Sequence, residues 1–442
     1  MFIPCVKRFA PPVILRAGRP RLMVVALMSL CGVFAPTSSN ANPTFNYRGY
    51  IDTGVVITDN YHAWSDGGIG KLRYGTDNDG HRSVLPRLSE ALLSLTAAYG
   101  THWEGRLDVK FDDRQRHLLD IAETFISYRS GPSQTMRWRA RIGSFLPPVS
   151  LENRAIGWTS PYTLSSSVLN TWIGEEIRIN GGELKLEKTF PFGVAKLFGA
   201  GFFANDNAGK LIALRGFATH DRKLTLFDTA PLPDFQVLLI HPRGPFRNIS
   251  RKFEPLHEID GRVGYYLGGE FKSAKYGLFR ITYYDNNADP EAFNRTAGQY
   301  AWDTRFIAAG FRSKLTPELT LIGQGMFGNT AMGPKFGRKN KRMSDTDFAT
   351  GFVLLNYRFN AAQVSFRGDY FEIMDRDAMR GRYDGDEDGY SLTFGGSINP
   401  ITRAKFSIEL QYIDHHRPVR MYADEPDSID ELMLRANLRF FF

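Results

Sequence analysis

The segment that most constrains the fold of this chain is its last dozen residues, 431–442, which alternate strictly in character. In an extended strand, successive side chains point to opposite faces. One face would carry only apolar residues: Leu432, Leu434, Ala436, Leu438, Phe440 and Phe442. The other would carry Met433, Arg435, Asn437, Arg439 and Phe441. This division is typical of a strand that separates hydrocarbon from a wet lumen.

The same two-residue period recurs through the chain, at 103–112, 136–143, 364–370 and 404–412. In 103–112 every second residue is charged, and a face this polar cannot pack against a second sheet, which disfavours a β-sandwich. No window of about 18 apolar residues follows residue 41, so no membrane-spanning helix is predicted. A closed β-barrel is the other structure that satisfies its own backbone in lipid.

The connections between these segments alternate between short and long, as in barrel hairpins. Short turns are predicted near 99–102, 130–134, 189–193, 272–275, 315–318, 360–362 and 399–402. Long loops are predicted at 59–84, 146–173, 205–260, 286–300, 329–345, 373–388 and 415–430. We therefore predict an all-β protein, a transmembrane antiparallel β-barrel of about 16 strands. A further hairpin from 210–219 and 234–240 would give 18 strands.

The first 41 residues have the features of a secretory signal peptide. Residues 1–21 contain five basic residues and no acid, an apolar run follows from 22 to about 35, and Ser39, Asn40 and Ala41 supply small residues. We predict cleavage after Ala41, which leaves 42–442 as a single transmembrane β-barrel domain. The predicted location is the outer membrane of a Gram-negative bacterium.

The charge of the chain depends largely on that leader. The 55 Lys and Arg residues exceed the 47 Asp and Glu residues by +8, and removal of five basic residues leaves 50 against 47, or +3. This near-neutral balance argues against nucleic acid as a partner. Cys5 and Cys31 are both in the leader, so we expect neither disulfides nor a thiolate metal site in the mature chain. No cofactor is predicted.

Arg137, Arg139 and Arg141 would form a ladder on one lumen-facing side of a strand, about 6.6 Å apart. Rows of fixed charge raise the local concentration of counter-ions in a pore. Other arginines that are inward by parity are Arg106, Arg178, Arg280, Arg367, Arg435 and Arg439. These residues either form a track for anions or pair with lumen acids such as Glu104, Asp108, Glu123, Asp369 and Glu409 and brace the wall.

A loop that follows the ladder is predicted to fold inward. Its paired prolines, Pro147 and Pro148, stop strand pairing. The loop is too apolar to extend into water, so we expect it to form a constriction over the lumen. Its candidate residues are Pro147, Pro148, Ser150, Glu152, Trp158 and Tyr162. The alternative is a loop that lies flat against a neighbouring subunit.

The strand end Gly143-Ser-Phe-Leu-Pro-Pro-Val-Ser-Leu-Glu152, with its Trp- and Tyr-containing loop, resembles the outer-membrane porins of the phosphate-selective O/P type. Phe442 resembles the C-terminal signal read by the barrel assembly machinery. The resemblance implies a sixteen-stranded homotrimer in which an inward loop and an arginine track guide anions. The chain departs from that family in its lumen acids and in the lack of an evident inward lysine cluster. A general or differently selective porin is therefore expected.

Two other motifs are weaker. Asp384, Asp386 and Asp388 have the spacing of the first half of a calcium loop, but Gly395 stands where a bidentate Glu belongs, so a solvated loop is favoured. His415 and His416 are adjacent and would point to opposite faces of a strand, which argues against a shared metal or a hydrolytic pair.

We predict a porin for passive diffusion of small hydrophilic solutes with a preference for anions. The expected partners are outer-membrane lipids and lipopolysaccharide, small anionic or polar solutes, and the assembly machinery. One alternative is an outer-membrane barrel enzyme, a hydrolase or protease, although no Ser/His/Asp set has consistent inward parity. The other is an adhesin or receptor barrel, although a first strand at about Thr44 leaves no room for an N-terminal plug.

Overall fold

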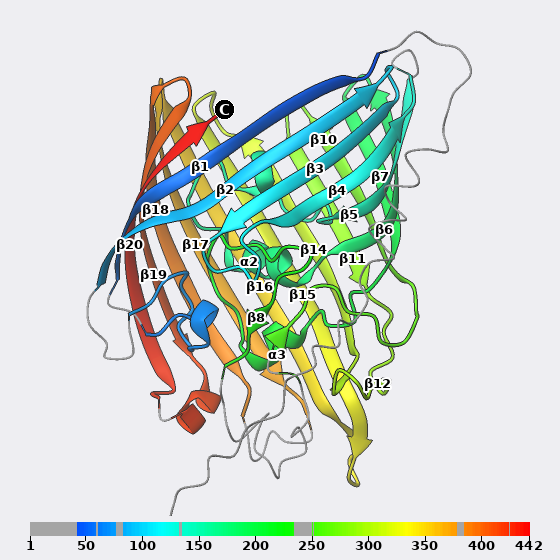
Figure 1. Cartoon of the computed structure of the whole chain (residues 1–442), viewed down its shortest axis with the longest axis vertical. Helices are drawn as coiled ribbons and strands as arrows, with labels where there is room; N and C mark the ends of the chain where they lie inside the picture. The colour runs from blue at the N-terminus through cyan, green and yellow to red at the C-terminus, as the bar shows by residue number, and fades with distance from the viewer. Residues whose placement is uncertain are drawn as a thin grey trace, which may run out of the picture. The chain divides into compact units, whose positions relative to one another are not determined.

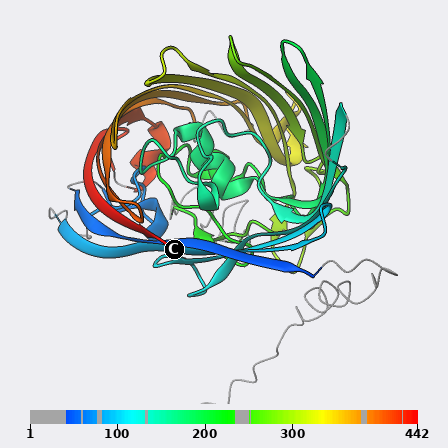
Figure 2. The ribbon, with the colours of Figure 1, turned by 90° about the horizontal axis from the view of Figure 1, so that it is seen from above.

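Sixteen antiparallel strands close into a barrel, and several helices lie inside the ring of strands (Figures 1 and 2). The computed structural model describes residues 42–58, 61–76, 83–131, 135–233, 250, 252–377, 384–423 and 425–442. Residues Pro43–Phe442 form one compact unit. Among the described residues, no helix is long and apolar enough to cross a membrane.

The barrel strands follow one another around the wall in chain order. They are β1 (Thr44–Thr58), β2 (Ser83–Tyr99), β3 (Trp103–Asp112), β4 (Asp120–Arg129), β5 (Met136–Phe145), β6 (Ile179–Phe190), β7 (Gly193–Phe203), β10 (Gly264–Ser273), β11 (Gly277–Asp285), β14 (Trp302–Lys314), β15 (Leu319–Phe336), β16 (Lys341–Phe359), β17 (Ala362–Asp375), β18 (Glu387–Ile401), β19 (Ala404–His416) and β20 (Ser428–Phe441).

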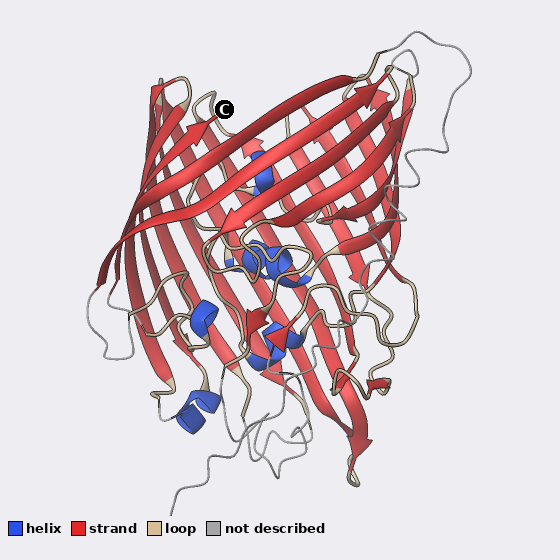
Figure 3. Cartoon of the chain, in the orientation of Figure 1, coloured by secondary structure: helices blue, strands red, loops and turns tan. Residues whose placement is uncertain are grey.

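The remaining elements are short and belong to the loops (Figure 3). The helices are η2 (Trp64–Asp66), η3 (Ile156–Trp158), α2 (Val168–Glu176), α3 (Lys210–Leu214) and η4 (Pro418–Ala423). Two small sheets pair β8 (Ala230–Pro231) with β9 (Lys252–Phe253) and β12 (Phe293–Asn294) with β13 (Gln299–Tyr300).

The last strand closes the barrel by pairing with the first, from Tyr50 opposite Phe441 to Thr58 opposite Met433. Its predicted division is confirmed: Leu432 and Phe440 are each 44% exposed on the outer side. Met433 and Arg435 are buried on the inner side. The two-residue period therefore did assign the faces of this strand correctly.

The predicted short turns all join neighbouring strands at one end of the barrel. The predicted long loop at 329–345 is wrong, because β15 continues to Phe336 and β16 begins at Lys341. The two strands pair as far as Phe336 opposite Lys341, across an irregularity between Met332 and Lys335. Pairing with a neighbour at each step thus extends both strands through residues that are polar enough to resemble a loop.

Segment 205–260 adds no strand to the wall, since β7 pairs directly with β10. The sixteen-strand prediction is confirmed and the eighteen-strand alternative is wrong. Residues 210–214 form α3 rather than a strand, and 234–240 lie outside the described residues. The described part of this segment folds into the lumen, as its contacts below demonstrate.

Candidate functional site

The loop between β5 and β6, residues 146–178, crosses the lumen and is held by the opposite wall; we call it the inward loop. Glu152 pairs with Arg367 of β17 at 2.8 Å, and the Ser165 amide donates to Glu409 of β19 at 3.0 Å. Next to Glu152 in the loop, the Leu151 amide donates a hydrogen bond to Gln324 of β15 at 3.1 Å. These bonds place the loop inside the barrel rather than against a neighbouring subunit.

The constriction residues named from sequence lie along this loop. Pro147, Ser150, Glu152 and Tyr162 are buried, and Pro148 and Trp158 are partly exposed. Trp158 has a positive φ of 57°, at the end of η3. Glu152 does not face open lumen, because besides Arg367 it accepts hydrogen bonds from the Ser167 amide at 3.0 Å and the Asn170 side chain at 2.9 Å. It anchors the start of α2.

The arginine ladder is present on β5, but two of its members face carboxylates. Arg139 pairs with Glu104 of β3 at 3.1 Å, and Arg141 pairs with Glu183 of β6 at 2.8 Å. Arg141 also lies over the ring of Phe145, 3.6 Å from its centroid. Arg137 is exposed. The ladder is therefore partly neutralised by its neighbouring strands.

The other arginines predicted to point inward are paired as well. Arg178 is buried and donates to the carbonyls of Ala122 and Leu224. The remaining partners are Asp108 for Arg106, Glu270 for Arg280, Asp369 for Arg367, Asp221 for Arg435 and Asp52 for Arg439. The positions of these arginine side chains are therefore explained by the contacts that brace the barrel wall.

Part of the lumen is filled with apolar side chains. Trp172 of α2 packs against Phe306 and Phe348, with ring centroids 5.4 and 5.1 Å apart. Phe217 packs against Phe348 and Phe371. The expectation of a wet lumen is thus wrong for this region, because the inward loop and segment 204–233 cover the inward faces of β14, β16 and β17. We call residues 204–233 the covering segment.

The two inserted segments are joined at Glu176, the last residue of α2. Its buried carboxylate accepts from the amides of Leu211 at 2.6 Å and Gly209 at 3.2 Å, at the start of α3, and from the Trp172 indole. Burial raises the pKa of Glu176 to about 7, against the opposing effect of these donors. Glu176 therefore acts as a latch between α2 and α3.

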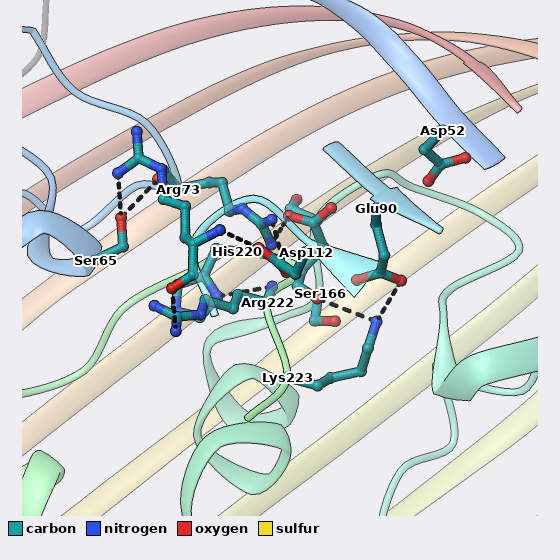
Figure 4. Close-up of polar contacts among 12 residues, drawn as sticks. Asp52, Ser65, Arg73, Glu90, Asp112, Ser166, His220, Arg222 and Lys223 are labelled. Carbon is teal, nitrogen blue, oxygen red and sulfur yellow. Dashed lines mark hydrogen bonds and ion pairs between the residues drawn. The ribbon is translucent and has the colours of Figure 1, made fainter. Parts of the chain in front are cut away.

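A buried polar cluster attaches the covering segment to the wall on the other side (Figure 4). Lys223 reaches Glu90 of β2 at 3.3 Å. Arg73, from the loop after β1, lies 3.1 Å from Asp112 of β3 and 3.3 Å from Asp221. Since Asp221 also pairs with Arg435, the covering segment is tied to β2, β3 and β20.

A basic recess remains beside the inward loop, on the side formed by β6, β7, β10, β11 and β14, with a cavity volume of about 270 Å³. Its cationic side chains are Arg154, Lys185, Lys196, Lys272, Arg280 and Arg312, and its single acid is Glu270. The expected lack of an inward lysine cluster is therefore wrong. Parity along 183–187, 194–198 and 270–272 could have revealed Lys185, Lys196 and Lys272.

Carboxylates neutralise only part of this recess. Glu270 is shared by Arg280 and by Lys196, the latter at 3.1 Å. Lys185 is 3.7 Å from Glu183, which already pairs with Arg141. The side chains of Lys272 and Arg312 form no hydrogen bond or ion pair with a described residue. The recess therefore keeps a net positive charge.

The predicted calcium residues are separated by their local structure. Asp388 is exposed on β18, whereas Asp386 accepts from the Asp375 amide and Asp384 from the Asp386 amide. Within the described ranges, three other acids bring ligand atoms within 4.8 Å of one another: Asp206, Glu258 and Asp260. Asp206 already accepts from the amides of Ile259 and Asp260.

No protein-family model matches the chain, and no curated protein matches it in sequence. Solved structures do match its fold. The outer membrane channel DcaP of Acinetobacter baumannii superimposes with a TM-score of 0.56 at 11% identity, over 92% of this chain and 100% of that one. The in-vitro folded outer membrane protein OmpT of Vibrio cholerae gives 0.50 at 8% identity, over 90% and 98%.

The chain has the fold of these outer-membrane proteins. The predicted likeness to bacterial outer-membrane channels is confirmed at this level. Identity near a tenth supports the fold alone, so the function has to be argued from the side chains of the lumen.

Proposed function

We propose that the protein is a channel of the Gram-negative outer membrane through which small hydrophilic solutes diffuse passively, with a preference for anions. The observation that carries this proposal is the basic recess, in which six cationic side chains surround one acid. Fixed charge of one sign in a confined lumen raises the local concentration of the opposite ion. The closed barrel supplies the wall, and its apolar outer side suits a bilayer.

The anion preference resides in the recess more than in the ladder. Arg139 and Arg141 face Glu104 and Glu183, which cancel much of their field. The side chains of Lys272 and Arg312 pair with no carboxylate of a described residue. The ladder continues the basic surface from β5 toward β6, where Arg139 lies opposite Lys185 in the register.

The covering segment narrows the lumen, and we infer that a shift of this segment widens the passage. Its apolar side chains pack against the inward faces of the wall, where Phe217 and Ile212 are fully buried. The latch at Glu176 holds this arrangement. We therefore assign the described conformation to a narrow state, in which the basic recess is reached from the short-turn end of the barrel.

Planar-bilayer recording of the purified mature protein tests the proposal. We expect ohmic current steps, and in a tenfold KCl gradient a zero-current potential with the sign of chloride selectivity. A protein that inserts and conducts no ions at any pH from 5 to 8 would contradict the channel. A cation-directed potential would contradict the anion preference and leave the channel in place.

An outer-membrane hydrolase is the rival function, and it would need a nucleophile beside a base. The buried His220 uses Nε2 for Glu175 at 2.9 Å, and its Nδ1 accepts the Arg222 amide at 3.1 Å. Nε2 of the buried His415 is 3.2 Å from Arg420. Both imidazoles are thus engaged in structural contacts, and we expect no turnover of peptide or lipid substrates.

The assembly of the protein is also part of the proposal. We propose a homotrimer that is delivered by the assembly machinery through its terminal strand and that contacts lipopolysaccharide through its outer side. Light scattering of the detergent-solubilised protein, corrected for bound detergent, should give three times the mass of one mature chain. The mass of a single chain would contradict the trimer.

A further inference from the structure

The hairpin of β15 and β16 ends in a strongly basic segment. Residues 335–342, which we call the basic tip, contain five cations and no acid: Lys335, Arg338, Lys339, Lys341 and Arg342. We propose that the basic tip binds the anionic sugars and phosphates of lipopolysaccharide in the outer leaflet. The inference rests on the proposed outer-membrane channel and assigns its contact with lipopolysaccharide to named residues.

The two strands of this hairpin are longer than a membrane crossing needs. β15 has 18 residues and β16 has 19, whereas a tilted transmembrane strand needs about 9–11. About eight residues of each strand are left over, and at about 3.3 Å each and a tilt of about 45° they rise about 19 Å above the hydrocarbon. β10 and β11, by comparison, have 10 and 9 residues. In Figure 1 the β15–β16 hairpin projects farther than the other strands at that end.

The basic tip lies at the end of the barrel that faces away from the periplasm. The short turns at 315–318 and 360–361 are at the opposite end of the same two strands. In outer-membrane barrels, short turns face the periplasm and longer connections face the outside. Lipid headgroups add only about 5–8 Å to each side of the hydrocarbon, so a tip that rises about 19 Å passes them. It reaches the saccharide layer of lipopolysaccharide, which carries phosphates and carboxylates.

Two cations of the basic tip fix its position. Lys341 donates to the Asp377 carbonyl at 3.0 Å. Arg342 donates to the Gly333 carbonyl at 2.9 Å and lies 3.4 Å from Glu291. The two strands also pair as far as the last residue of β15. The tip is therefore a preformed surface, which lowers the entropic cost of binding.

The other three cations are available to a ligand. The side chains of Lys335, Arg338 and Lys339 are exposed and form no hydrogen bond or ion pair with a described residue. In the register Lys335 lies directly opposite Arg342, and like charges in this position destabilise a sheet. An oxyanion beside them would relieve this repulsion and accept charge-assisted hydrogen bonds.

The outer side of the same hairpin suits the hydrocarbon of such a ligand. Phe327 is 61% exposed there and Val353 is 53% exposed. An open apolar groove crosses this side, lined on the hairpin by Gly323, Gly325 and Val353 among others. A soluble polyanion has no part that would contact this surface. Lipopolysaccharide has acyl chains at the level of the groove and anionic sugars at the level of the tip, so one molecule can contact both.

Isothermal titration calorimetry of the purified mature protein in detergent tests the inference. The probe is purified lipopolysaccharide dispersed in the same detergent. One comparison is phosphatidylethanolamine, which has acyl chains and a zwitterionic headgroup, and the other is heparin, a soluble polyanion without acyl chains. We expect lipopolysaccharide to half-saturate the protein at a concentration at least tenfold below those of both comparisons. Phosphatidylethanolamine or heparin that binds as tightly as lipopolysaccharide would overturn the inference.

Two triple variants locate the binding. The test variant neutralises the available cations of the tip: Lys335→Gln, Arg338→Gln and Lys339→Gln. The control variant neutralises three exposed cations at the short-turn end: Lys188→Gln, Lys275→Gln and Lys314→Gln. The test variant should bind lipopolysaccharide at least tenfold more weakly, and the control should bind it as the wild type does. Equal weakening in both would mean that net charge alone governs the binding, which would overturn the inference.

A smaller variant guards against loss of the fold. Should the test variant fail to fold, as judged by the heat-dependent shift of the barrel on a gel, the substitutions at 338 and 339 serve alone. Both residues lie in the turn between the strands, where no barrel pairing depends on them.

Binding in detergent is independent of conductance, so failures of the two proposals can be told apart. Lipopolysaccharide binding that the test variant leaves unchanged would overturn this inference, whatever current the channel carries. A shift of the zero-current potential with unchanged binding would mean that the tip steers solutes instead, and would also overturn it. The predicted binding pattern in a protein without conductance would contradict the channel and support the basic tip as a site.

Discussion

Arg367 has two carboxylate partners, and this pairing decides what the residue can do. Its guanidinium is fully buried, 2.8 Å from both Glu152 and Asp369, and it donates to the Ser165 carbonyl at 2.9 Å. A solute in the lumen cannot displace three such bonds to a buried group. Lys272 has no such partners among the described residues. Two inward cations thus differ in how they are paired.

Replacing Arg367 by Met should destabilise the protein by about 3–5 kcal/mol, since two buried carboxylates lose their counter-charge. Arg139→Met is the matched control on the same lumen surface. Arg139 is half-exposed beside Glu104, and its loss should cost about 1 kcal/mol or less. Denaturant titration of the refolded barrels in vesicles gives both free energies of unfolding. Equal losses in the two variants would contradict the anchoring role of Arg367.

At the scale of single residues, the sequence predicts which face of a strand a side chain lies on better than it predicts which residue the side chain pairs with. The two-residue period correctly turned Arg367, Arg435 and Arg439 toward the lumen, because each lies in a regular strand. It could not tell that Asp221, in a loop, would reach Arg435, since that contact joins segments more than 200 residues apart. The lysines of the basic recess obey the same period and could have been identified from it.

Among the secondary structure elements, α2 and α3 determine how open the lumen is. The capping of α2 is local: Ser167 accepts from the Asn170 amide at 3.2 Å. Its position is not local, because it depends on Phe306 and Phe348 of the opposite wall. The position of α3 depends in turn on Glu176. The inward loop could be predicted from its prolines, but the covering segment has no comparable sequence signal.

The latch predicts that conductance rises with pH. The pKa of Glu176 is raised to about 7 in the docked state, from 4.5 for a free carboxyl group, so the docked state binds the proton more tightly. The docked state is the described arrangement, in which α3 is held by Glu176. This arrangement is therefore favoured at low pH, and it weakens as the pH rises from about 4.5 to 7. Single-channel recording of the wild type across this range should show increasing open probability.

Glu176→Gln should reduce this pH dependence, and an unchanged profile would contradict the latch. The charged groups that face Glu176 are Glu175, Arg215 and Lys210. Arg215 keeps the pKa of Glu175 down at about 2 despite its burial, and burial lowers that of Lys210 to about 8, so both titrate outside the window. Burial also raises the pKa of Asp206, in the covering segment, to about 7, and burial lowers the pKa of His220 below its usual value. We assign any residual dependence to these two groups.

At the scale of the whole molecule, sixteen strands, their order and their short turns could be predicted because they follow from local alternation. The erroneous loop at 329–345 marks the limit of that approach, since pairing with a neighbour extended both strands beyond their apolar residues. The apolar filling of the lumen was also beyond it. Inward residues such as Phe202, Tyr284 and Phe306 are ordinary strand formers until segments from other loops cover them.

The predicted signal peptide is not tested by the structure of the barrel, because residues 1–41 lie outside the described ranges. We expect the mature protein to begin at Asn42. N-terminal sequencing of protein isolated from outer membranes should read Asn-Pro-Thr-Phe-Asn. Any other first residue would contradict the predicted cleavage after Ala41, and retention of Cys31 would point to a different kind of leader.

The central claim is that this barrel conducts anions in preference to cations because of the unpaired cations in its basic recess. The most direct measurement is the zero-current potential in a tenfold KCl gradient for the wild type, Lys272→Gln with Arg312→Gln, and Arg139→Gln with Arg141→Gln. The first double variant should move the potential toward cation selectivity by clearly more than the second, whose arginines face Glu104 and Glu183. A larger shift from the ladder variant, or no shift from the recess variant, would contradict the account.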